Sequence, residues 1–189
     1  VGVSVTVLRQ QVGGRACHRV WCDYSAGVYL WETLTGQRLF RASSDVELMK
    51  LVSAARVEAM KPAFAALMAA DGWLPEAYGS PDHSSGMGSG IGQYALYRAE
   101  DGSLTLFSLV IPAGAETPVH DHLAWGLVGL YQGAQDEEVF LREPGGDEEA
   151  GHAPLTLTAR NAILPGDFYT LLPPEGDIHR VVTTSDIAS

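Results

Sequence analysis

Three of the six histidines are spaced so that they could bind one metal ion together. His120 and His122 are separated by a single residue, and alternate side chains of a β-strand share a face. Both imidazoles could therefore point into the same interior. His179 lies far downstream in another strand-like segment, just after a turn rich in proline and glycine. The histidine pair is a weak signal by itself, but with His179 it predicts a facial set of ligands that leaves the opposite coordination positions open.

The residues around these histidines follow a pattern of their own. The first block reads Gly114-x5-His120-x-His122 and is followed by Gly133, and the second reads Gly166-x7-Pro174-x-Gly176-x2-His179. Taken together, the two blocks resemble the two motifs of the cupin superfamily over roughly residues 114–183. The resemblance implies a small β-barrel with the metal inside its mouth.

The sequence departs from the usual cupin motif at one ligand position. Most cupins carry a glutamate three or four residues after the second histidine, where this chain has Trp125 and Gly126. Asp121 lies between the two histidines and should face away from them. The predicted ligand set is therefore three neutral imidazoles without a carboxylate. Imidazoles suit Fe(II), Zn, Cu or Ni, so the ligands alone do not select the metal.

Longer stretches are similar to the bacterial thiol dioxygenases, the cysteine dioxygenase-like group, from about Ala63 to Thr183. They are DGWLPEAY, GQYALYRAEDGSLTLFSLVIPAGAETPVHDH and TPVHDHLAWGLVGLYQG. The resemblance implies a mainly β fold, a cupin double-stranded β-helix barrel with a short N-terminal α-helical segment. It also implies Fe(II) held by His120, His122 and His179, with O2 and a small organic thiol as substrates and a sulfinic acid as product.

Gln93 is the substrate-binding residue that this resemblance suggests. It stands where cysteine dioxygenases place the arginine that holds the substrate carboxylate. Glutamine is found there in relatives that act on 3-mercaptopropionate, so that thiol is slightly preferred over cysteine. The alternative is that Gln93 is an ordinary residue at a strand end.

A second departure concerns the residues that follow the third histidine. The family places a Ser-x-His-x-Tyr hydrogen-bonding set soon after it, and the sequence reaches Ser189 without such a set. Because groups around the ligands affect metal affinity and rate, the iron site is better supported than turnover. Two alternatives stay open: a cupin that uses Zn, Mn or Ni for non-oxidative chemistry, and a metal-binding cupin without enzymatic activity.

Other reactive residues have simpler interpretations. Cys17 and Cys22 lack the further ligands that a zinc site needs, and we expect ordinary thiols. His83 lies in a Gly/Ser-rich loop and His152 in an acidic one, so both should be solvated.

Polar and aromatic residues near the motifs also have simple interpretations. Trp125 and Tyr131 should belong to the core, although they could line the pocket. Arg180 should point to the opposite face from His179 and form a salt bridge. The acidic run Asp136–Glu138 is interpreted as solvated loop charge.

The secondary structure expected for the elements that position the site differs along the chain. Residues 1–43 show no sustained period beyond a strand-like alternation over Val1–Leu8, and whether they fold onto the rest stays open. A helix should begin at Ser44 or Asp45 and end or kink at Pro62, with a second short helix after it. From Gln93 onward, short β-like segments are separated by Gly/Pro turns. We expect residues 44–92, a helical lead-in and loop, to form one domain with a barrel over 93–189.

Composition excludes several function classes. The 189 residues carry 12 Lys+Arg and 23 Asp+Glu, a net charge of −11, so binding to nucleic acid is not expected. No apolar run of about 18 residues occurs, so no membrane span is expected. Two cysteines cannot form a disulfide framework, which favours a reducing, cytoplasmic setting. The sequence does not determine the oligomeric state.

Overall fold

The computed structural model describes residues 2–9, 45–100, 102, 104–122, 124–147, 152–173 and 176–185. The predictions for Cys17 and Cys22 therefore lie outside the described residues.

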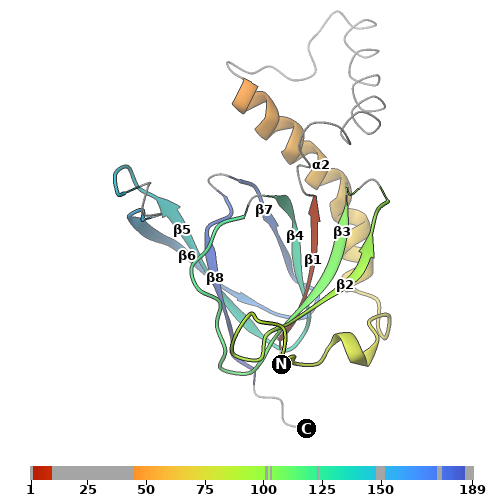
Figure 1. Cartoon of the computed structure of the whole chain (residues 1–189). Coiled ribbons are helices and arrows are strands. Elements are labelled where there is room, and N and C mark those ends of the chain that lie inside the picture. The colour runs from red at the N-terminus through yellow and green to blue at the C-terminus, as the bar shows by residue number, and fades with distance from the viewer. Residues whose placement is uncertain are drawn as a thin grey trace, which may run out of the picture.

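The described chain is mainly β, as predicted, and its strands form two antiparallel sheets (Figure 1). The larger sheet has the strand order β2-β3-β1-β4-β7, and the smaller one has the order β6-β5-β8. The strands of the larger sheet are β1 (Gly2–Arg9), β2 (Gly92–Arg98), β3 (Thr105–Ile111), β4 (Trp125–Gln132) and β7 (Phe168–Leu171). Those of the smaller sheet are β5 (Gln135–Arg142), β6 (Leu155–Ile163) and β8 (His179–Thr183).

The N-terminal strand lies in the middle of the larger sheet. Its backbone pairs antiparallel with β3, from Gly2 opposite Ile111 to Leu8 opposite Thr105, and with β4 on its other side. The alternating apolar residues at the start of the chain thus belong to a strand. This strand joins two others that are far from it in sequence.

Helix α2 (Asp45–Met68) packs against the larger sheet through one apolar stripe. Val57, Phe64 and Met68 are buried at helical spacing and form a core cluster with residues of β4. Gly129 permits this close approach, because a Cβ atom there would lie 2.9 Å from Phe64 Cε1 and 3.0 Å from Met68 Sδ. The short 3-10 helix η1 (Glu76–Tyr78) follows.

The prediction of two separate helices is wrong, because α2 continues through Pro62. Proline removes one backbone donor from a helix, which normally favours a break. Here Pro62 lies on the exposed side, and the next turns carry Phe64 and Met68, which are fixed against the sheet. Tertiary packing thus outweighs the local preference.

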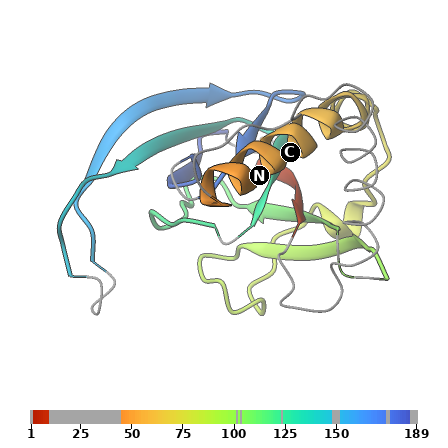
Figure 2. The same ribbon diagram turned by 90° about the horizontal axis from the view of Figure 1, so that it is seen from above.

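The two sheets face each other, and apolar residues from both meet between them. Ile91, Ile111 and Val181 form this second cluster, with Leu109 and Ala115 packed against it. The segment between β3 and β4 crosses to the smaller sheet, where Glu116 bridges to Val182 and His120 to His179. Figure 2 shows the long, curved β5–β6 hairpin extending to one side. None of the described helices is long and apolar enough to cross a membrane.

Candidate metal centre

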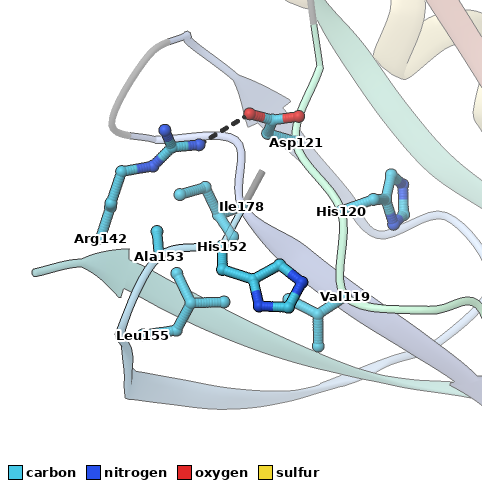
Figure 3. A pocket seen from close by; sticks show the side chains of 8 residues that line it. All are labelled: Val119, His120, Asp121, Arg142, His152, Ala153, Leu155 and Ile178. Carbon is cyan, nitrogen blue, oxygen red and sulfur yellow. Dashed lines mark hydrogen bonds and ion pairs between the residues drawn. The ribbon is translucent and has the colours of Figure 1, made fainter. Parts of the chain in front are cut away.

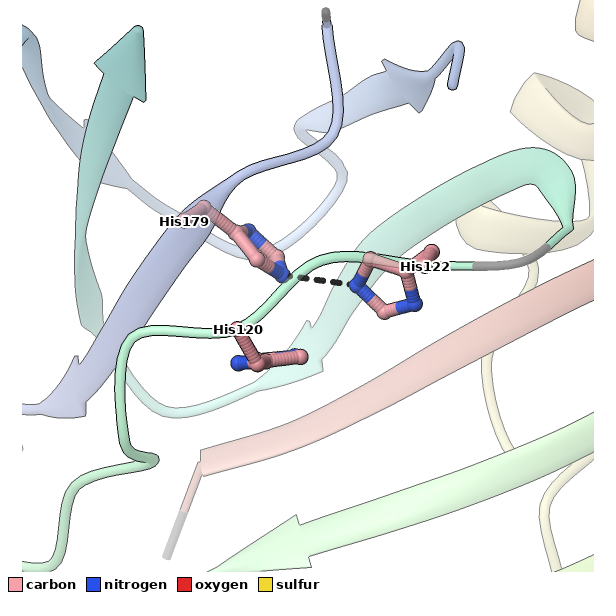
Figure 4. A group of neighbouring side chains, drawn as sticks. All are labelled: His120, His122 and His179. Atoms are coloured by element: carbon pink, nitrogen blue, oxygen red, sulfur yellow. Dashed lines mark hydrogen bonds between the residues drawn. The ribbon is translucent and has the colours of Figure 1, made fainter. Parts of the chain in front are cut away.

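The structure brings the three predicted histidines together between the sheets (Figure 4). His179 is the first residue of β8, whereas His120 and His122 lie outside the regular strands. The expectation of a strand at the histidine pair is therefore wrong in detail, because only His120 pairs with β8. Its N–H donates to the His179 carbonyl over 3.0 Å, and the His179 N–H donates back over 3.0 Å. Backbone pairing thus fixes the spacing between the two segments that carry the ligands.

The geometry of the cluster suits a metal ion. One nitrogen from each of His120, His122 and His179 lies within 4.8 Å of the others. The Nε2 atoms of His122 and His179 are 3.0 Å apart. Two ligands that are each about 2.0–2.1 Å from one ion, at roughly right angles, would have a similar separation. Among the described residues, no carboxylate belongs to this group.

Hydrogen bonds at the Nδ1 atoms fix the orientation of two of the three imidazole rings. His120 Nδ1 lies 2.9 Å from the Pro118 carbonyl, and His179 Nδ1 lies 3.1 Å from Glu137 Oε1. A carbonyl or a carboxylate accepts a hydrogen bond, so each Nδ1 carries the proton. The Nε2 atom of each ring therefore keeps its lone pair for a metal.

A buried aspartate positions the second histidine. The backbone N–H of His122 donates to Asp177 Oδ2 over 2.7 Å. Asp177 is 2 % exposed, and burial raises the pKa of its carboxyl group. Its other oxygen has no hydrogen-bond partner within the described part of the chain. Asp177 thus ties the segment of His122 to the start of β8.

The interpretation of Asp136–Glu138 as solvated loop charge is wrong in two respects, because the run lies in a strand and only Asp136 is exposed. These residues lie in β5, where alternate side chains point to opposite faces, and Glu137 is 3 % exposed. Its Oε1 pairs with His179, and its Oε2 accepts a hydrogen bond from Asn161 Nδ2 over 3.0 Å. The segment QDEEVFLR shows no polar/apolar alternation that could have revealed this buried face.

Tyr169 of β7 is another residue that the sequence analysis missed. Its ring lies 5.8 Å from that of His179, at an interplanar angle of 72°. Burial, and then the charge of Glu137, raise the pKa of this tyrosine well above its usual value. The phenol therefore stays neutral beside the histidine cluster.

Gln93 lies on the edge strand β2, with an exposed side chain. It is directly opposite Leu109 in the antiparallel ladder, and Leu109 packs into the cluster between the sheets. Residues opposite each other share a face, so Gln93 is on the inner face of the sheet. No contact between Gln93 and the three histidines is described.

Two predictions about neighbours of the ligands are confirmed. Arg180 pairs with Glu138 at 2.6 Å and with Glu116 at 3.3 Å, away from His179. Asp121 turns away from the histidines and pairs with Arg142 at 2.9 Å.

The more distant aromatic and histidine residues also lie where they were expected. Trp125 is buried in the cluster under α2, against which Tyr131 packs. His83 and His152 are exposed. His152 is not isolated, however, because it lines a cavity of about 400 Å³. The other lining residues in Figure 3 are Val119, His120, Asp121, Arg142, Ala153, Leu155 and Ile178.

The protonation of two histidines of the cluster should make the metal-free protein sensitive to acid. Burial lowers the pKa of His122 to about 4, helped by the charges of His179 and His120, and burial also lowers the pKa of His120. The fold therefore favours the neutral rings. This stabilisation is fully present above the unfolded value of about 6.5 and is lost as the pH falls through the folded values.

We expect the melting temperature of the metal-free protein to fall between about pH 6.5 and pH 4, more steeply for wild type than for His122→Gln. Thermal melts across this range measure the difference. Because the carboxylates are common to both proteins, parallel curves would contradict the assignment to His122.

A scan against models of known protein families finds no family that matches the chain.

Proposed function

We propose that the protein is an Fe(II)-dependent dioxygenase with a cupin barrel that converts a small organic thiol to its sulfinic acid. The observation that carries the proposal is the group of three histidines without a carboxylate. The two facing antiparallel sheets, with the histidines between them, support a cupin-type arrangement. The resemblance of residues 63–183 to thiol dioxygenases supports the choice of metal and reaction.

The ligand chemistry favours an anionic substrate. Three neutral imidazoles leave the double charge of a divalent ion uncompensated among its direct ligands, which favours a thiolate as a further ligand. Ferrous iron at this site would supply the redox chemistry that allows dioxygen to react with the thiolate. In the overall reaction, RSH + O2 gives RSO2H. Sulfur loses four electrons and dioxygen gains four, so no external reductant is consumed.

The chain itself would orient the reactants and exclude water. The Ile91–Ile111–Val181 cluster is an apolar layer between the sheets, and Val181 is two residues from His179 on the same face of β8. Gln93, on the inner face of β2, has amide N–H groups that could bind a substrate carboxylate. This role supports the slight preference for 3-mercaptopropionate over cysteine. A reducing, cytoplasmic environment would keep both the thiol and Fe(II) in the required state.

Oxygen uptake tests the proposal directly. Protein that is loaded anaerobically with Fe(II) should consume one O2 per sulfinate formed when 3-mercaptopropionate is added, and should act less efficiently on cysteine. Zn(II)-loaded protein is the matched control and should consume none. Gln93→Ala should raise KM for 3-mercaptopropionate more than it lowers kcat. Stoichiometric iron binding without oxygen uptake with either thiol would reject the dioxygenase and favour a metal-binding protein or a non-oxidative enzyme.

A further inference from the structure

Glu137 is a carboxylate buried against a metal-ligand candidate although it belongs to no ligand motif. It is 3 % exposed, and the His179 residue that it contacts is 5 % exposed. An ionised carboxylate is costly to bury unless its oxygens are paired. Both are used here, since Oε1 lies 3.1 Å from His179 Nδ1 and Oε2 lies 3.0 Å from Asn161 Nδ2. The side chain is therefore held at both ends.

The register of the smaller sheet explains why these three side chains meet. Strand β5 is the central strand, with Glu137 opposite Asn161 of β6 and opposite Val181 of β8. His179 is two residues from Val181, so its side chain shares the face of Glu137 on the diagonal. All three residues of the chain Asn161–Glu137–His179 are thus fixed by strand pairing.

The hydrogen bond from His179 to Glu137 has two consequences for a metal ligand. It keeps the proton on Nδ1 and aims the Nε2 lone pair toward His122 Nε2, which is 3.0 Å away. The negative charge of Glu137 would also partly offset the charge of a bound cation. Neither effect requires Glu137 to touch the metal.

We propose that Glu137 is a positioning residue that sets the orientation and the tautomer of His179, so that the metal affinity of the histidine site depends on strands β5 and β6. This inference rests on the metal-binding part of the proposed function and is independent of thiol oxidation. Asn161 acts indirectly, because it donates a hydrogen bond to the second carboxylate oxygen of Glu137 and so orients that side chain.

Zinc binding to the purified full chain tests the proposal without any thiol or dioxygen. The dissociation constant for Zn²⁺ alone is measured by competition with a chromophoric chelator. Glu137→Gln keeps the shape and an acceptor oxygen but loses the charge, and we expect about 10-fold weaker binding, with up to about 100-fold for Glu137→Ala. Asn161→Ala, at an exposed position, should weaken binding less. The matched control is Glu138→Gln, because the neighbouring Glu138 pairs with Arg180 and Arg160 on the other face.

Nitrogen NMR of the histidine rings gives a second readout that a merely structural role would not move. In the metal-free wild type, His179 should show a protonated Nδ1 and an unprotonated Nε2, and Glu137→Ala should show a mixture of tautomers. Thermal melts identify variants that are folded, and Asn161→Ala keeps the test available if the Glu137 variants do not fold. Unchanged zinc affinity in a folded Glu137→Gln protein, or an unchanged tautomer in a folded Glu137→Ala protein, would overturn the inference. If neither variant folds, unchanged zinc affinity in Asn161→Ala would overturn it. Absence of oxygen uptake by the wild type would reject the dioxygenase alone.

Discussion

Replacing His179 with alanine should abolish stoichiometric metal binding and, with it, any oxygen uptake. His179 is buried, its Nε2 is 3.0 Å from that of His122, and its Nδ1 is fixed by Glu137. The remaining pair, His120 and His122, belongs to one segment outside the regular strands. Loss of a residue that hydrogen-bonds to a metal ligand typically weakens metal binding about 10–100-fold. Loss of the ligand itself should therefore lower the metal affinity more than about 100-fold. Elemental analysis after Fe(II) loading and desalting measures the effect.

This substitution also leaves Glu137 buried without its histidine partner, so a loss of folding must be separated from a loss of metal binding. His120→Ala serves this purpose, because the Nδ1 atom of His120 contacts only the Pro118 carbonyl among the partners described. His152→Ala removes an exposed histidine near the same segment and should leave metal content unchanged. If folded His120→Ala and His179→Ala proteins both retained iron at the wild-type ratio, the three-histidine site would be wrong.

The features of the fold and of the site that depend on residue spacing could be predicted from local sequence patterns. The His-x-His pair and the distant His179 could be assigned to one site because the resemblance related two blocks that the fold brings together. The short strands followed from alternation and Gly/Pro turns. The sequence also predicted that the side chain of Arg180 points away from that of His179, because adjacent strand residues point to opposite faces. Each of these inferences uses a period or a motif that is visible within a few residues.

Features that depend on contacts with residues far along the chain could not be predicted from local sequence patterns. Glu137 resembles its acidic neighbours in sequence, and its burial arises only because β6 and β8 flank β5 and supply Asn161 and His179. Pro62 should stop a helix locally, yet contacts between α2 and β4 keep the helix continuous. In both cases, tertiary pairing overrides the average behaviour of the residue type.

Phe64→Ala should produce the largest loss of stability among single substitutions in α2, while leaving the metal site intact. Phe64 is 4 % exposed and belongs to the cluster that joins the helix to β4. Its ring meets that of Phe168 edge to face at 5.6 Å. Removing such a buried ring costs about 3–5 kcal/mol, against a total stability of about 5–15 kcal/mol for a typical domain. We expect the melting temperature to fall by about 10 °C.

Leu51→Ala is the matched control, because Leu51 lies on the same helix but is 38 % exposed, and it should change the melting temperature little. The cluster around Phe64 packs on the face of β4 opposite to the inter-sheet space, where the histidines lie. Zinc affinity of Phe64→Ala should therefore stay near the wild-type value at temperatures where the protein is folded. A large loss of affinity without unfolding would mean that docking of α2 helps to position the ligands, and an unchanged melting temperature would mean that α2 contributes little to the core.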